Sequence, residues 1–182
     1  MGGNAEGLAG VFVEPEEDVC RLCFSADIPI SRDSQHPNQV DPVTGLLRLE
    51  EISWKDVKHD GFSLQRKNLY SHAEALREAE RRDSKKSQQR GVDVHYRLAG
   101  TLIARVENIN SIADDEGRQV FCVLATPIKE QPGHVEGQPA HAEIRVLGHI
   151  VQKHQFLKFR QRLRDALGRM LAPESIDAVV KA

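Results

Sequence analysis

Two pairs of residues combine side chains that could carry out acid–base or metal chemistry. His59 and Asp60 are adjacent, and His141 and Glu143 are separated by a single residue. Imidazole exchanges protons near neutral pH, and carboxylates bind hard metal ions. His141 could act as a general base or a metal ligand, with Asp60 or Glu143 as a carboxylate ligand. If the fold brings these four residues together, the sequence predicts a hydrolase or nuclease acting on a phosphodiester or small polar substrate.

The surrounding sequence matches no known catalytic signature. The chain has no H-E-x-x-H and no H-x-H-x-D segment, so the alternative is that His59 is solvated and His141 bonds a backbone carbonyl. It also lacks G-x-S-x-G, G-x-x-x-x-G-K-[ST] and G-x-G-x-x-G. These motifs build nucleophile elbows and phosphate-binding loops. The sequence therefore argues against nucleotide-triphosphate hydrolysis and dinucleotide-dependent redox chemistry, and we expect no cofactor.

The cysteines offer a second possible chemistry, because Cys20 and Cys23 have the C-x-x-C spacing. Two thiolates at this spacing can bind zinc from a tight turn, but a structural zinc site needs four ligands. Cys122 and a histidine could complete the set. If residues 19–24 form a strand, however, Cys20 and Cys23 point to opposite faces and cannot share a metal. We expect small buried thiols and no metal site.

Residues 152–171 form the clearest structural pattern in the chain. They contain six bases and one acid, Asp165. Their large apolar residues recur at steps of three and four, so these residues share one face of a helix. We predict an amphipathic helix whose exposed cations form a binding surface. An acidic protein partner or a nucleic acid would fit this surface, and a solvated face without a partner is the neutral alternative. The predicted binding residues are Lys158, Arg160, Arg162 and Arg164.

The composition is ordinary for one globular domain. The chain has 182 residues, 40% of them apolar and 29% charged, and its net charge of −2 gives no overall attraction to nucleic acid or anionic membrane. No apolar run approaches the roughly 20 residues that cross a bilayer, and residues 1–6 lack the features of a secretory signal. Three cysteines do not suggest a disulfide framework. We expect a reduced, cytoplasmic protein with no membrane partner.

Hydrophobic patterning and turn residues predict the fold class. Residues 1–18 are acidic and are predicted to form a flexible tail, followed by a single domain over residues 19–182. Short strands in series, joined by turns, favour an antiparallel or mixed sheet of five to six strands with two to three helices, an α+β arrangement. The C-terminal helix should pack on that sheet, and residues 83–90 should form a loop. The predicted strands are 19–24, 62–66, 92–106, 119–126 and 142–147, and a further helix is predicted over 71–82. Residues 45–54 are expected to form a strand or a short extended segment. Gly100 should either divide residues 92–106 into two strands or mark a bulge.

Two segments carry a resemblance to a known group of proteins. One is His59–Arg66, with the pattern D-G-[hydrophobic]-S, and the other is Pro127–Ile144, a Pro-rich loop that ends in Ala140-His141. Together they resemble short, uncharacterised bacterial proteins in which each pattern precedes a strand and a basic terminal helix follows. The resemblance covers residues 19–168. It implies a bacterial, cytoplasmic origin and a compact α+β domain, and it assigns no catalytic residues.

Because no complete catalytic constellation stands out, the first expectation is a non-catalytic binding or accessory module. Such a module would contact a partner protein through its loops or the basic helix. The enzyme hypothesis requires His59 and His141 to converge. The nucleic-acid hypothesis predicts binding that weakens steeply as salt rises.

Overall fold

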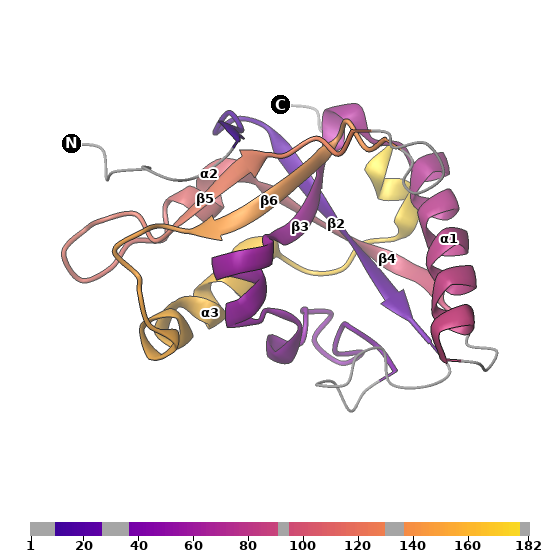
Figure 1. The fold of residues 1–182 in the computed structure, drawn as a ribbon, viewed down its shortest axis with the longest axis horizontal. Coiled ribbons are helices and arrows are strands. Elements are labelled where there is room, and N and C mark those ends of the chain that lie inside the picture. Colours follow the sequence, from indigo (N-terminus) through magenta and orange to yellow (C-terminus); the bar gives the residue numbers. More distant parts are fainter. Residues whose placement is uncertain (1–9, 27–36, 91–94, 130–136, 179–182) are drawn as a thin grey trace.

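The computed structural model describes residues 10–26, 37–90, 95–129 and 137–178. In these residues the chain forms one antiparallel sheet (Figure 1). The six strands in these residues follow the order β1-β5-β6-β3-β2-β4, and every neighbouring pair is antiparallel. The predicted α+β class is therefore confirmed. The strands are β1 (Val11–Phe12), β2 (Asp18–Ser25), β3 (Phe62–Arg66), β4 (Arg97–Arg105), β5 (Phe121–Ala125) and β6 (His141–Val146).

Three α-helices and several single turns connect and cover the sheet in the described residues. The helices are α1 (His72–Arg90), α2 (Val106–Asn110) and α3 (Lys153–Leu167). The turns are 3-10 segments at Leu49–Glu51, Lys67–Leu69 and Pro173–Ile176, and a π-helical turn at Asp56–Asp60. None of these helices has the length and hydrophobicity to span a lipid bilayer.

The main core lies between one face of the sheet and α3. The helix buries Phe156, Phe159, Leu163 and Leu167, which are the residues whose spacing predicted an apolar face. The Phe156 ring meets Phe121 of β5 edge to face, with 6.3 Å between centroids. The prediction that the C-terminal helix packs on the sheet is therefore confirmed. The helix ends at Leu167 rather than at residue 171, because Gly168 has a φ of 74° and reverses the chain.

The opposite face of the sheet is only partly covered by apolar groups. Helix α1 packs Ala75 and Ala79 against Cys20, Leu22 and Phe24 of β2. Side chains alternate between the two faces along a strand. The neighbouring part of this face, over β3 and β6, instead carries polar residues, and α1 lies to one side of it (Figure 1). This uneven covering leaves polar side chains beside a helix.

Strand β2 departs from β3 halfway along its length. The two strands pair only at Val19 and Cys20, with Arg66 and Gln65 as their partners. Further along, the backbone of Phe24 bonds to Gln39 instead. On its other side β2 pairs with β4 throughout, and the register shifts next to Gly100, which marks a bulge as its sequence position allowed. The divergence of β2 from β3 opens a gap in the sheet.

The end of the first helix was predicted wrongly. The capping box is present, with Ser71 Oγ accepting from the Glu74 backbone and Glu74 accepting from the Ser71 backbone. The helix continues to Arg90 rather than ending at residue 82. Residues 83–90 lack apolar side chains, which suggested a loop. However, Lys, Gln and Arg favour helices, so the helix propagates without an apolar face.

The predicted sixth strand and the predicted tail also need correction. Residues 45–54 form isolated bridges and a 3-10 turn, and the sixth strand is Val11–Phe12, paired with β5. Residues 11–12 and 18 therefore lie in strands of the sheet, and the segment between them packs against the domain rather than forming a flexible tail. Val13 is buried in the core, and the Glu17 carboxylate accepts hydrogen bonds from two nitrogens of Arg66. Residues 1–9 of the predicted tail lie outside the described residues.

Candidate functional site

The two segments that carry the resemblance form neighbouring strands. In the register of β3 and β6, Ser63 lies opposite Glu143 and Gln65 lies opposite His141. Residues two apart on a strand share a face, so these four side chains occupy one patch. We call Ser63, Gln65, His141 and Glu143 the polar patch. Ser63 is exposed, and the other three are buried. A sheet face of this kind normally carries apolar side chains where it is buried, so the patch is unusual.

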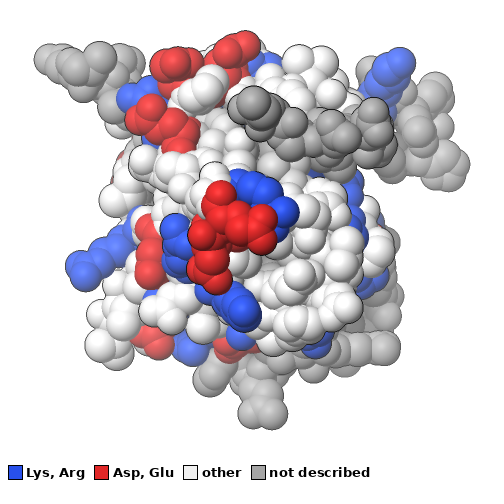
Figure 2. All heavy atoms as spheres, turned by 90° about the vertical axis from the view of Figure 1, so that its left-hand side faces the viewer, with Lys and Arg blue, Asp and Glu red and all other residues white. Residues whose placement is uncertain are grey.

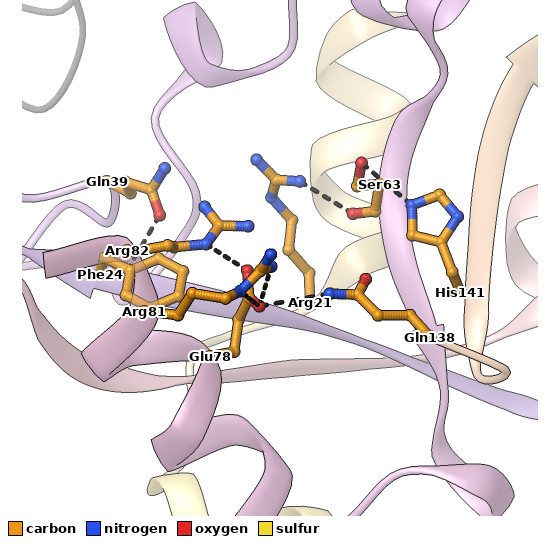
Figure 3. Close-up of polar contacts among 9 residues, drawn as sticks. All are labelled: Arg21, Phe24, Gln39, Ser63, Glu78, Arg81, Arg82, Gln138 and His141. Atoms are coloured by element: carbon orange, nitrogen blue, oxygen red, sulfur yellow. Dashed lines mark hydrogen bonds and ion pairs between the residues drawn. The ribbon is translucent and has the colours of Figure 1, made fainter. Parts of the chain in front are cut away.

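Ser63 and His141 contact each other diagonally across the patch (Figure 3). The distance from Ser63 Oγ to His141 Nε2 is 3.4 Å. The other ring nitrogen, Nδ1, lies 3.0 Å from the Thr126 carbonyl oxygen and 2.9 Å from Thr126 Oγ1. A carbonyl oxygen can only accept, so Nδ1 carries a proton, and in the neutral form of such a ring Nε2 is the acceptor that faces Ser63. The expected bond from His141 to a backbone carbonyl is therefore present.

An arginine binds the Glu143 carboxylate, and a glycine leaves space for it. Its Oε2 accepts from Arg145 Nε at 3.0 Å and Nη2 at 2.7 Å, and Arg145 Nη1 donates to the His59 carbonyl at 2.5 Å. Gly61 makes room for the carboxylate, because a Cβ there would lie 2.7 Å from Glu143 Cγ and closer still to the carboxyl carbon. Gly61 also has a φ of 85°, which side-chain-bearing residues rarely adopt. The D-G pair thus builds the edge of the patch.

The four predicted catalytic residues do not converge. His141 and Glu143 share the patch, but the side chains of His59 and Asp60 are exposed at the end of the π-helical turn. Asp60 pairs with Lys55 at 3.1 Å, and His59 contributes its backbone carbonyl to Arg145. Within the described residues neither side chain contacts His141 or Glu143, so the joint His/Asp/Glu site stays a prediction. Among the described residues, no group of three or more His, Cys, Asp or Glu is arranged to hold a metal ion.

A groove beside the patch is lined by arginines of α1 (Figure 3). The Glu78 carboxylate, with a side chain only 10% exposed, pairs with both Arg81 and Arg82, whose side chains are 41% and 45% exposed. Gln138 Nε2 donates to the same carboxylate at 3.3 Å. Arg77, one turn earlier, is exposed and has no partner within the described residues. Glu78 thus fixes Arg81 at the wall of a cavity of about 260 Å³ and Arg82 at the wall of a smaller adjoining cavity of about 30 Å³.

Arg21 enters the same region from the gap between β2 and β3. Its Nη1 donates to the Ser63 carbonyl at 2.9 Å, and its guanidinium lies 4.0 Å from the centre of the Phe62 ring. Burial lowers the pKa of Arg21 below its ordinary value. Two buried polar atoms in this region, Arg21 Nε and Gln65 Oε1, have no hydrogen-bond partner among the residues that the structure describes. Unsatisfied buried polar atoms are rare in native proteins and need an explanation.

These two cavities adjoin at Glu78 and form one feature, which we call the arginine groove. Its described lining includes four guanidinium groups and two carboxylates, so two positive charges remain in excess. One of the carboxylates, Glu74, is already engaged in capping α1. The charged lining residues are Arg21, Arg77, Arg81, Arg82, Glu74 and Glu78. The groove can therefore hold an oxyanion through planar, paired donors.

The predicted binding residues of α3 do not form one surface. Successive residues of a helix are about 100° apart, so residues two apart lie on opposite sides. Lys158 and Arg162 therefore flank one side of the buried stripe, and Arg160 and Arg164 flank the other. Arg162 Nη1 donates to the Ala113 carbonyl at 2.8 Å, and Arg164 pairs with its neighbour Asp165 at 3.0 Å. Figure 2 shows the end of the molecule at which β5 and β6 lie, where acidic and basic side chains intermix.

The cysteines are separated by the sheet. Cys20 belongs to the cluster under α1, whereas Cys23 belongs to the main core, so they face opposite sides as the strand interpretation required. Burial raises the pKa of each of these thiols to about 12, and that of Cys122 to about 11. Buried protonated thiols are poor nucleophiles and poor metal ligands.

Sequence reasoning missed Ser63, Arg21 and the role of the α1 arginines. Ser63 stood within the D-G-[hydrophobic]-S pattern and was not considered as a partner of His141. Arg21 had a local signal, since it is a single charge in the apolar run from Val19 to Phe24. The α1 arginines looked like a solvated helix laced with ion pairs. Comparison with known proteins does not alter this picture, because no protein family, curated protein or solved structure matches the chain.

Proposed function

We propose that this protein is a binding module that holds a small phosphorylated or carboxylated molecule in the arginine groove. The proposal rests on the pair Arg81 and Arg82. Both are ion-paired with the buried Glu78 carboxylate, while about half of each arginine side chain stays exposed. A carboxylate that fixes guanidinium groups reduces the entropy lost when they bind a ligand. The proposal keeps the binding-module class expected from the sequence and assigns the contact surface to α1 rather than to α3.

The hydrogen-bonding groups around the groove support an oxyanion ligand. Arg82 donates its Nε to Glu78, and its terminal nitrogens make no hydrogen bond within the described residues. Arg81 likewise uses Nε and Nη2 on Glu78, which leaves Nη1 for a ligand. Arg21 Nε, buried beside the adjoining cavity, is a further donor without a partner among the described residues. An oxyanion would accept hydrogen bonds from the arginine nitrogens, and the cavity of about 260 Å³ beside Arg77 and Arg81 is suited to a compact molecule.

Thermal unfolding in the presence of inorganic phosphate tests the proposal. A ligand that binds only the folded state stabilises it, and phosphate at ten times its dissociation constant adds about 1.4 kcal/mol. For a chain of this length the Tm should rise by about 3–6 °C. The measurement compares phosphate with chloride at equal ionic strength, because phosphate also stabilises proteins by exclusion from their surface.

The decisive variant is Arg77→Gln combined with Arg81→Gln. Glu78 keeps Arg82 as its ion-pair partner in this variant, so the fold should be preserved. We expect the specific Tm rise to disappear. The matched control is Arg164→Gln on α3, which removes an arginine paired with Asp165 at the surface and should keep the full rise. An equal rise in the double variant and the wild type would reject the groove as the binding site.

A further inference from the structure

The contact between Ser63 and His141 has the elements of an activated nucleophile. A serine hydroxyl becomes nucleophilic when a base within hydrogen-bond reach accepts its proton and a third group orients that base. Here Ser63 Oγ lies 3.4 Å from His141 Nε2, and the Thr126 carbonyl lies 3.0 Å from Nδ1. Such bonds are commonly long in the absence of substrate and tighten when it binds. The three roles of nucleophile, base and orienting acceptor are therefore all filled.

Burial divides these roles in the way that catalysis requires. His141 is 7% exposed, so its ring is held between the strands and Thr126. Ser63 is exposed on the same face and can meet a substrate. Burial fixes the orientation of the base, while exposure of the hydroxyl permits attack. A histidine with only a structural role would be satisfied by Thr126 alone and would not need Ser63.

Positive charge lies next to the nucleophile. Arg21 Nη1 donates to the backbone carbonyl of Ser63 itself, at 2.9 Å, and Arg21 Nη2 makes no hydrogen bond within the described residues. Gln65, two residues along the same strand, brings its amide to the same face and lines the same cavity. The nucleophile thus stands at the rim of a cavity that carries cationic and amide groups.

We propose that Ser63 is a nucleophile with His141 as its general base, and that this pair cleaves carboxylic esters. In the first step Ser63 Oγ forms a bond to the ester carbonyl carbon while its proton passes to His141 Nε2. The bond from that carbon to the alcohol oxygen breaks, and the departing alcohol takes the proton from His141. Water then attacks the acyl-serine with His141 again accepting a proton, which releases the carboxylic acid and restores Ser63. The proposal does not depend on anion binding in the arginine groove.

A fluorophosphonate probe tests the nucleophile directly. The serine oxygen forms a bond to phosphorus, fluoride leaves, and the hydroxyl proton passes to His141. We expect one adduct per chain, mapped to Ser63 by peptide mass spectrometry, and a burst of p-nitrophenol from p-nitrophenyl acetate. Ser63→Ala should abolish both, whereas Ser111→Ala, which also alters an exposed serine, should change neither.

The role of the base is tested with His141→Gln. Labelling of this variant should be slower than that of the wild type by at least about 100-fold, the usual range for loss of a general base. Circular dichroism shows whether the variant folds, and if it does not, the mapped wild-type adduct still decides the question. No adduct on the wild type, an adduct on a different residue, or equal labelling of a folded His141→Gln variant would overturn the proposal. His141 lines neither cavity of the arginine groove, so the phosphate-dependent Tm rise should be the same in a folded His141→Gln variant and wild type, and the two proposals can fail separately.

Discussion

Replacement of Gly61 by alanine should destabilise the protein through two separable effects. The first is conformational, because Gly61 has a φ of 85° and a ψ of 130°. An L-residue held in such a region costs about 1–3 kcal/mol. The second is steric, because the new Cβ would occupy the position of the Glu143 side chain. The carboxylate must then leave Arg145, and loss of hydrogen bonds to a charged group costs about 1.5–3 kcal/mol.

The expected loss in the free energy of unfolding is therefore about 2.5–6 kcal/mol, measured by urea denaturation. This is a large share of the stability of an ordinary domain, about 5–15 kcal/mol. Gly117→Ala is the matched control. Gly117 also has a positive φ, 74°, but a Cβ there would meet no atom within 4 Å. Gly117→Ala should therefore lower the free energy of unfolding only through the conformational effect, by about 1–2 kcal/mol.

A double-mutant cycle with Glu143→Ala separates the two effects. Removal of the carboxylate removes the clash, so Gly61→Ala should cost only its conformational share in that background. The coupling energy between the two changes should then be about 1.5–3 kcal/mol. A coupling below about 0.5 kcal/mol, the limit of ordinary additivity, would refute the claim that Gly61 is required to accommodate Glu143.

Three further predictions concern the core and the thiols. Phe156→Ala removes a ring that is fully buried and should lower the free energy of unfolding by about 3–5 kcal/mol. Leu157→Ala, at the exposed neighbouring residue, should change that free energy by less than about 0.5 kcal/mol. Similar losses in the two variants would contradict the assigned helix face. Iodoacetamide at pH 8 should modify Cys20 and Cys23 far more slowly in the folded protein than in urea, since burial raises the pKa of both to about 12, and equal rates would show that the thiols are accessible. The thiols of the unfolded chain lose their protons at a lower pH than the buried thiols of the folded protein. The free energy of unfolding should therefore fall as pH rises above about 9, by about 1.4 kcal/mol per pH unit for each thiol. A free energy of unfolding that does not change over this alkaline range would contradict the raised thiol pKa values.

Part of the architecture was predictable because the information is local. The buried face of α3 follows from the spacing of Phe156, Phe159 and Leu163, since helix geometry repeats every 3.6 residues. The start of α1 follows from Ser71 and Glu74, whose side chains bond to backbone groups within one turn. Even the division of the α3 cations between two sides could have been calculated from the same geometry. The length of α1 was predicted wrongly, because its last two turns have no apolar residues and form through the helix propensity of their polar residues.

The candidate site depended on the tertiary structure. Ser63 and His141 are 78 residues apart in the sequence, and only the register of β3 with β6 brings them into contact. Arg21 reaches Ser63 because β2 diverges from β3 after Cys20, which no local pattern indicates. A strand's sequence shows which residues share a face, but not which strand will lie beside it. Residue types and helix faces were therefore determined by the chain, whereas the pairing that turns separate polar residues into a patch was decided by how the strands assemble.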